Sequence, residues 1–111
     1  MNDKIIQTVC KTWNVSLGNV CGRSRKQDVV YTRMTIAYFL RQYTKLSMTE
    51  IGNLINRDHA TIIHYLKACD SEFCFNKDFR NFAERIKEDL QDIIKSSFVL
   101  ELEEEFNEIR G

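Results

Sequence analysis

The sequence predicts an all-α fold of five to seven helices, and three observations lead to that prediction. The chain of 111 residues holds no proline and only four glycines, which leaves little material for the turns of a β-sheet protein. Apolar residues recur at intervals of three and four, which is the spacing of one helix face. Polar residues suited to capping helix ends stand at several of the breaks between these periodic segments.

The N-terminal part of the chain predicts one helix over residues 3–13 and a shorter one after it. Asn14 is expected to end the first helix, Ser16 to cap a short turn, and Gly22 to interrupt the chain. The apolar stripe of the first helix consists of Ile5, Ile6, Val9 and Trp13. A densely basic loop, Gly22-Arg23-Ser24-Arg25-Lys26, follows.

A long helix is predicted next, with Asp28 as its N-terminal cap and its end near Tyr43. Its inward-facing stripe is predicted to consist of Ile36, Phe39, Leu40 and Tyr43. Arg33 and Arg41 are expected on another face of this helix.

Two short helices joined by a tight turn are predicted after the long helix. Ser47 and Glu50 have the spacing of a capping box, in which each side chain satisfies a free backbone N–H of the other residue. Asn56 tolerates the left-handed conformation that a tight turn requires, and Asp58 is placed to cap a helix over residues 59–70. The core side of that helix is predicted to be Ile62, Ile63 and Leu66.

The C-terminal part predicts two more helices, over residues 77–95 and 98–109. The first carries Phe79, Phe82, Ala83, Ile86, Leu90 and Ile93, and the second carries Phe98, Leu102, Phe106 and Ile109. We expect one domain over residues 1–95 and an acidic helical extension over residues 96–111.

The net charge of zero conceals an asymmetry along the chain. Residues 1–68 hold ten Lys and Arg against four Asp and Glu, whereas residues 69–111 hold six against twelve. The balance excludes a uniformly basic, histone-like protein. The asymmetry indicates that the first two-thirds of the chain meets a polyanion.

The four cysteines are expected to be reduced thiols, mostly in the core, because none forms a CxxC pair. His59, His64, Cys69 and Cys74 follow one another in steps of five, which separates neighbouring side chains by about 140° around a helix. They therefore do not converge on a metal, and neither a metal nor a cofactor is expected. No signal peptide and no membrane-spanning run is visible, so the expected location is cytoplasmic.

Two short helices with a tight turn are typical of a helix-turn-helix, whose second helix fits the major groove of DNA. His59, Ala60 and Thr61, with His64 one turn on, form the exposed start of this second helix. A threonine hydroxyl bonds to bases or phosphate, and an alanine methyl contacts a thymine methyl. Arg57 in the turn is within reach of a phosphate or a guanine edge. From periodicity alone, a plain helical hairpin within a core stays open as the alternative.

Residues 51–64, which read IGNLINRDHATIIH, closely resemble the signature of the C-terminal DNA-binding domain of the bacterial replication initiator DnaA. The likeness extends upstream to the basic residues 23–26 and to a long helix over residues 32–44, and covers about residues 3–95. A chance helix-turn-helix rarely also carries the basic loop at the right distance.

The resemblance implies a set of DNA contacts. Arg25 matches an arginine that enters the minor groove, and Arg33 matches one that contacts phosphate. Asp58 is expected to accept a hydrogen bond from a cytosine amine while it caps its helix, with capping alone as the alternative. The expected contact residues are Arg23, Arg25, Lys26, Arg33, Arg41, Lys45, Met48, Thr49, Arg57, Asp58, His59, Ala60, Thr61 and His64.

Some residues depart from the family pattern. Asn56 stands in place of the usual pair of glycines, Ala60 in place of the first threonine, Met34 in place of a common glutamine and Tyr65 in place of a small residue. The loss of one base-facing hydroxyl changes the preference at one base pair by about 1–3 kcal/mol. We therefore expect a DNA site that differs from the initiator's standard box.

The sequence indicates a recognition domain and not an enzyme. No GxxxxGK[ST] phosphate-binding loop is present, so no nucleotide is expected, and no nucleophile or paired carboxylates accompany the two histidines. The prediction is sequence-specific binding to double-stranded DNA in replication initiation or its regulation. A helix-turn-helix transcriptional regulator is the first alternative, and a protein–protein interaction module that acts through the acidic tail is the second.

Three roles are open for residues 97–111. The segment packs back on the domain, binds a second copy or another replication protein, or covers the basic face as an acidic flap.

Overall fold

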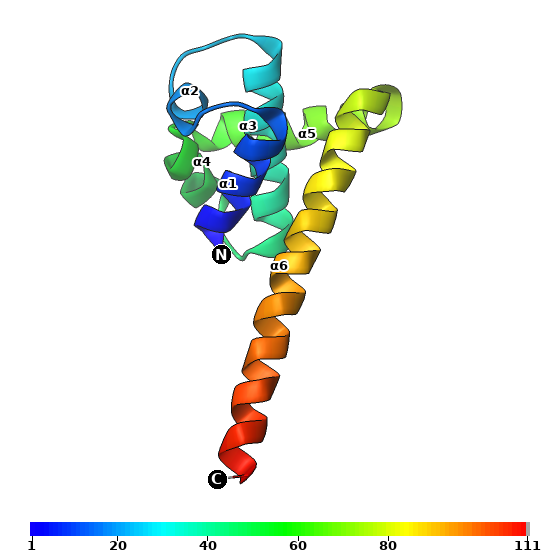
Figure 1. The fold of residues 1–111 in the computed structure, drawn as a ribbon. Coiled ribbons are helices and arrows are strands. Elements are labelled where there is room, and N and C mark those ends of the chain that lie inside the picture. The colour runs from blue at the N-terminus through cyan, green and yellow to red at the C-terminus, as the bar shows by residue number, and fades with distance from the viewer. Residues whose placement is uncertain (111) are drawn as a thin grey trace.

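The computed structural model describes the backbone of residues 1–110 and the side chains of residues 1–96, and this part of the chain contains six helices and no strand. The helices are α1 (Asn2–Trp13), α2 (Leu17–Cys21), α3 (Gln27–Tyr43), α4 (Met48–Ile55), α5 (His59–Phe75) and α6 (Lys77–Arg110). The all-α prediction is confirmed, and the number of helices lies within the expected range (Figure 1).

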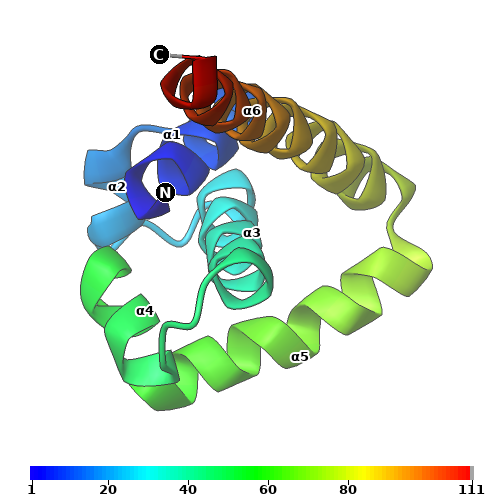
Figure 2. The same cartoon turned by 90° about the horizontal axis from the view of Figure 1, so that it is seen from below.

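Helix α3 forms the centre of the domain. Figure 2 looks along α3 and shows the other helices arranged around it. Its buried residues are Val29, Thr32, Arg33, Met34, Thr35, Ile36, Ala37, Phe39 and Leu40, which cover most of its circumference. A helix buried on nearly all sides does not show one clean apolar stripe. This explains why the predicted stripe identified only part of its buried surface.

An aromatic cluster fastens α6 to α1 and α3. The ring of Trp13 stacks on Phe82 at a centroid distance of 4.3 Å, and Tyr31 meets Phe79 edge-on at 5.2 Å. Phe79 is 1% exposed, and the indole Nε1 of Trp13 donates to the hydroxyl of Thr35 at 3.2 Å. Aromatic pairs of this kind add about 0.5–1.5 kcal/mol each beyond the burial of their area.

The predicted helix ends are confirmed where local capping residues define them. Asn14 and Asn56 have φ values of 55° and 58° and end α1 and α4 in the left-handed conformation. Ser16 caps α2, and Ser47 with Glu50 forms the predicted capping box of α4.

Three predicted boundaries are wrong. Lys26, not Asp28, is the N-cap of α3, and Asp28 lies in the first turn, where its carboxylate accepts from the N–H of Val29. Helix α5 continues to Phe75 and does not end near Asp70. The two helices predicted over 77–95 and 98–109 are a single helix, α6.

The predicted core side of α5 is wrong in part. Ile62 is fully buried, but Ile63 is 38% exposed and Leu66 is half-buried. The buried face consists instead of Ile62, Tyr65 and Cys69. The expected packing of residues 97–111 lies outside the described side chains. Among the helices that the structure describes, none combines the length and hydrophobicity that a bilayer-spanning segment needs.

Candidate nucleic-acid interface

The turn between α4 and α5 brings the two helices into a helix-turn-helix. Asn56, Arg57 and Asp58 make up the turn, and the N–H of Arg57 donates to the carbonyl of Gly52 at 2.8 Å. Asp58 caps α5 by accepting the N–H of Thr61 at 2.8 Å. The capping role predicted for Asp58 is thus confirmed.

Gly52 permits the close approach of the turn to α4. A Cβ added at this position collides with the carbonyl oxygen of Arg57 and lies 3.1 Å from its carbon. The same glycine accepts, through its carbonyl, the N–H groups of Asn56 and Arg57. A glycine is therefore required here because backbone occupies the space of a side chain.

The exposed face of α5 is wider than the sequence indicates. His59, Ala60 and His64 are exposed, as a role in reading DNA requires, whereas Thr61 is half-buried. Ile63 and Lys67 are exposed as well, and they follow Ala60 by three and seven residues. Residues at that spacing lie on the same side of a helix. Sequence reasoning missed both, and their spacing from Ala60 is the signal that identifies them.

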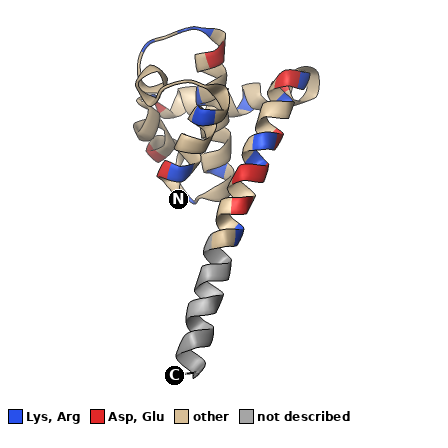
Figure 3. Ribbon diagram, in the orientation of Figure 1, with Lys and Arg blue, Asp and Glu red and all other residues tan. Residues whose placement is uncertain are grey.

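The basic loop, residues 22–26, connects α2 to α3 at the top of Figure 1. Arg23, Arg25 and Lys26 are exposed on it. Figure 3 shows basic residues along this loop, whereas the described part of α6 carries both signs of charge. The exposed cations of the loop make it suited to a polyanionic partner.

Side chains of the helix-turn-helix hold the base of the basic loop. The amide nitrogen of Asn56 donates to the carbonyl of Cys21 at 3.2 Å, and the guanidinium of Arg57 donates to the carbonyl of Gly22. Arg57 also donates to the carbonyl of Asn56 at 2.8 Å. The thiol of Cys21 donates in turn to the carbonyl of Leu54 at 3.7 Å. The start of the basic loop and the turn that leads into α5 are therefore neighbours, although more than thirty residues separate them.

The sequence predicted Arg33 on a face of α3 away from the inward-facing stripe, but Arg33 lies in the interior. Its side chain is 3% exposed. Its guanidinium donates to four carbonyls, those of Val20 at 2.7 Å, Ser24 at 2.6 Å, Asn19 at 2.9 Å and Gly22 at 3.0 Å. These carbonyls include those at the C-terminal end of α2, which have no partner within a helix. Arg33 thus ties α2 and the basic loop to α3, and this interior position corrects the expectation from the sequence.

The electrostatic surroundings of Arg33 follow from this position. Burial lowers the pKa of Arg33, the positive charge of Arg57 lowers it further, and the phenol of Tyr65 acts in the opposite direction. Tyr65 is 8% exposed and belongs to the buried face of α5. The tyrosine that departs from the family pattern therefore borders the buried arginine.

The remaining predicted residues lie at the junction of α3 and α4. Arg41, Lys45 and Thr49 are exposed, and Met48 is half-buried. The guanidinium of Arg41 donates to the carbonyl of Leu46 at 3.3 Å, which leaves the group at the surface.

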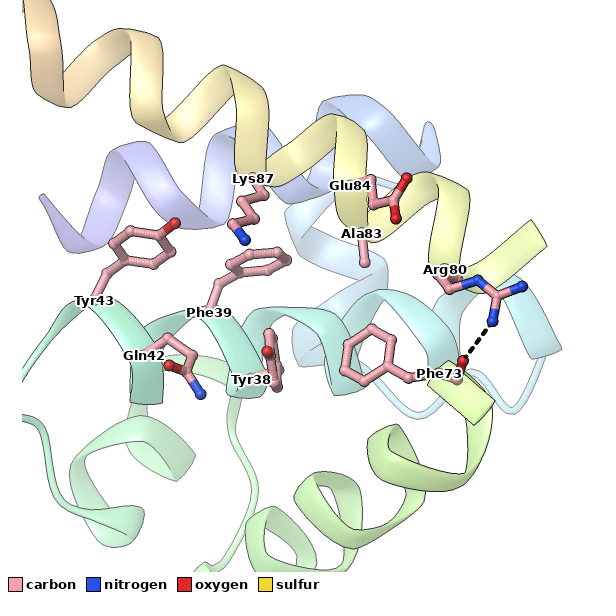
Figure 4. Close-up of a pocket in the computed structure, with 9 residues that line it drawn as sticks. All are labelled: Tyr38, Phe39, Gln42, Tyr43, Phe73, Arg80, Ala83, Glu84 and Lys87. Carbon is pink, nitrogen blue, oxygen red and sulfur yellow. Dashed lines mark hydrogen bonds between the residues drawn. The ribbon is translucent and has the colours of Figure 1, made fainter. Parts of the chain in front are cut away.

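A separate groove of about 420 Å³ lies between α3, the end of α5 and α6 (Figure 4). It is lined by Tyr38, Phe39, Gln42, Tyr43, Phe73, Arg80, Ala83, Glu84 and Lys87. Glu84 is the one carboxylate among these nine residues, and none of them is a serine, cysteine or histidine.

The helical arrangement and the short turn before a helix with an exposed N-terminal face define a helix-turn-helix domain. The family model described as bacterial dnaA protein helix-turn-helix matches residues 2–68. The chain belongs to this family, as the sequence resemblance predicted.

Relatives of this chain are proteins named chromosomal replication initiator protein DnaA. The protein from Bacteroides fragilis (strain YCH46) is 35% identical over 86 residues, which cover 77% of this chain and 18% of the relative. The protein from Flavobacterium psychrophilum is 34% identical over 89 residues, or 79% of this chain and 19% of the relative. The DnaA 1 protein of Chlamydia pneumoniae is 32% identical over 94 residues, or 84% of this chain and 20% of the relative. The chain thus matches about a fifth of the length of these relatives.

Proposed function

We propose that this chain binds double-stranded DNA in a sequence-specific manner and acts in replication initiation or its regulation. The exposed N-terminal face of α5 reads the major groove, and Arg25 of the basic loop enters the minor groove with Arg23 and Lys26 beside it. The family membership supports DNA as the partner. The names of the relatives support a place in replication initiation.

One observation carries this proposal, namely that Asn56 and Arg57 tie the basic loop to the turn of the helix-turn-helix. These bonds bring the start of the loop that carries the exposed cations next to the turn that leads into the exposed start of α5. A major groove about 12 Å wide admits a helix, and the adjacent minor groove attracts arginine where A·T pairs narrow it.

The proposed direct contacts are exposed residues, together with half-buried Met48 and Thr61. They are Arg23, Arg25, Lys26, Arg41, Lys45, Met48, Thr49, Asp58, His59, Ala60, Thr61 and His64, to which the structure leads us to add Ile63 and Lys67. Arg33 and Arg57 are left out because their guanidinium groups donate to backbone carbonyls. Ala60 and Ile63 offer methyl groups for thymine, in place of the hydroxyl that the family presents at position 60.

Selection of bound duplexes from a random-sequence DNA library tests this proposal. We expect one enriched sequence, and an affinity whose logarithm falls against the logarithm of salt concentration with a slope near −5 for about six phosphate contacts. Arg25→Ala and His59→Ala should each weaken binding to the enriched duplex by about tenfold or more. Arg85→Ala, an exposed arginine on α6, is the matched control and should leave the affinity within about twofold. The absence of any enriched sequence, together with a flat salt dependence, would overturn the proposal.

A further inference from the structure

The contacts of Arg57 assign it a role that differs from the reading of a base. Its guanidinium donates to the carbonyls of Asn56 at 2.8 Å and Ile55 at 3.4 Å within the turn, and to the carbonyl of Gly22 across from it. The side chain is half-buried among these groups. A guanidinium has five N–H donors, and three of those of Arg57 are engaged by these backbone carbonyls, which holds the group between the turn and the start of the basic loop.

Gly22 is the residue at which α2 ends and the basic loop begins. Its carbonyl accepts hydrogen bonds from both Arg33 and Arg57. Arg33 holds this carbonyl from α3, and Arg57 holds it from the turn that leads into α5. The bond from Asn56 to the carbonyl of Cys21 lies directly beside this pair and connects the same two segments.

The basic loop approaches the minor groove and the start of α5 approaches the major groove in the proposed function, on which this inference rests. Rigid connection of a loop and a helix fixes the distance between the groups that they present. An insertion of one base pair displaces the two halves of a DNA site by about 3.4 Å along the axis. A protein with a fixed distance between its reading elements therefore discriminates between DNA sites by their spacing, in addition to their bases.

We propose that Arg57 is a positioning residue that, through Gly22, sets the spacing between the minor-groove and major-groove parts of the DNA site. Asn56 supports it through Cys21. The specificity of the protein thus includes a spacing requirement set by hydrogen bonds within the protein.

The experiment compares the enriched duplex with a duplex that carries one additional base pair between its two parts, by fluorescence anisotropy. The wild-type protein should bind the lengthened duplex about 10–100-fold more weakly, as expected for the loss of one set of groove contacts. Arg57→Ala should weaken binding to the original duplex but reduce the penalty for the inserted base pair to about threefold or less. When each base pair of the original site is replaced in turn, the Arg57→Ala protein should discriminate at every position as the wild-type protein does.

Asn56→Gly is the second variant, since glycine adopts the left-handed conformation of this position without the side-chain amide. It removes the tie to Cys21 and leaves Arg57 in place, so it should also reduce the penalty for the inserted base pair. This variant tests the connection between the two segments without a change at Arg57, and circular dichroism shows whether either variant fails to fold.

An unchanged spacing penalty in a folded Arg57→Ala protein would overturn the positioning role. Lost discrimination confined to one base pair would also overturn it and would identify Arg57 as a base-reading residue. An unchanged penalty in Asn56→Gly would contradict the role of this second tie. These results leave the proposed function intact because the wild-type protein then still binds its enriched duplex. Failure of the wild-type protein to bind any duplex is a different result and would overturn the proposed function itself.

Discussion

Arg33 and Arg57 donate hydrogen bonds to the same backbone atom, the carbonyl oxygen of Gly22. The two arginines come from α3 and from the turn of the helix-turn-helix, and they meet at the end of α2. Two positive charges beside one another are tolerated here because backbone carbonyls at a helix C-terminus carry partial negative charge. Two arginines that the sequence resemblance matches to DNA contacts are thus bonded to the backbone of the protein itself.

The interior position of Arg33 predicts a large effect on stability. Arg33→Met keeps much of the side-chain volume and removes every donor to the four carbonyls, so the free energy of unfolding should fall by about 2–4 kcal/mol. Urea-induced unfolding at 25 °C measures this change. Arg41→Met, at an exposed site on the same helix, is the control and should change stability by less than about 0.5 kcal/mol. Equal effects of the two substitutions would refute the anchoring role of Arg33.

Gly52 and Gly18 provide a matched pair of glycines within helices. Gly52→Ala should destabilise the protein by about 1–3 kcal/mol, because the added methyl group collides with the backbone at Arg57. The Cβ of an alanine at position 18 meets only the hydroxyl of Ser16 at 3.9 Å, so Gly18→Ala should stabilise the protein by about 0.5–1 kcal/mol. Thermal unfolding of both variants checks the opposite signs. A stabilising Gly52→Ala would mean that the turn lies further from α4.

The cap at the start of α5 predicts a dependence of stability on pH. Hydrogen bonds from Thr61 to the carboxylate lower the pKa of Asp58 below its usual value. The folded state therefore favours the ionised form, and this contribution is present above the ordinary pKa of an aspartate and disappears as the pH falls through the lower pKa of the folded protein. Titration of the carboxyl carbon by NMR measures the shift directly. Asp58→Asn keeps a capping oxygen and should remove this part of the acid sensitivity, and an Asp58 that titrates at its ordinary pKa would exclude the mechanism.

The cysteines should react with thiol reagents in an order set by their surroundings. Burial, followed by the neighbouring charges of Asp70 and Glu72, raises the pKa of Cys69 to about 12, and its thiol donates to the carbonyl of Met34 at 3.4 Å. Cys74 is exposed near the end of α5. Because the thiolate is the reactive form, Cys74 should be alkylated rapidly in the folded protein and Cys69 only after unfolding.

Mass spectrometry of peptides after short exposure to iodoacetamide at pH 8 measures the order of alkylation. Cys74→Ser should remove the fast phase. Alkylation of Cys69 at the rate of Cys74 would place α5 away from α3.

The features that were predictable from the sequence are those governed by neighbours within a few residues. The capping box of Ser47 and Glu50 and the left-handed turns at Asn14 and Asn56 depend on side chains that bond to the backbone nearby. Their signals are local, and the structure confirms them. The helix-turn-helix was recognisable for the same reason, since its turn and its caps occupy a short stretch of chain.

The features that escaped prediction depend on contacts between distant segments. Arg33 bonds to carbonyls 9 to 14 residues before it, and no periodic pattern encodes such partners. A buried arginine also contradicts the usual preference of charged side chains for the surface. Ile63 is apolar, so periodicity assigned it to the core, but Ile62, Tyr65 and Cys69 define the buried face. Which of two adjacent isoleucines faces inward depends on how α5 packs against α3 and α4.

The charge asymmetry of the sequence has gained a more specific meaning from the structure. Of the basic residues in the first two-thirds of the chain, Arg33 is buried, and the guanidinium of half-buried Arg57 donates to backbone carbonyls. The exposed loop cations Arg23, Arg25 and Lys26 meet the polyanion in the proposed interface.

The central claim is that the basic loop and the start of α5 form the DNA interface. Its most direct test is a titration of ¹⁵N-labelled protein with the enriched DNA duplex, in which the amide chemical shifts are measured. The expected changes are largest in residues 22–26, 48–49 and 58–67, which form the proposed surface, and small along the described part of α6. Changes concentrated on α6 or on the groove beside it, with the basic loop and the start of α5 unaffected, would contradict the proposed interface.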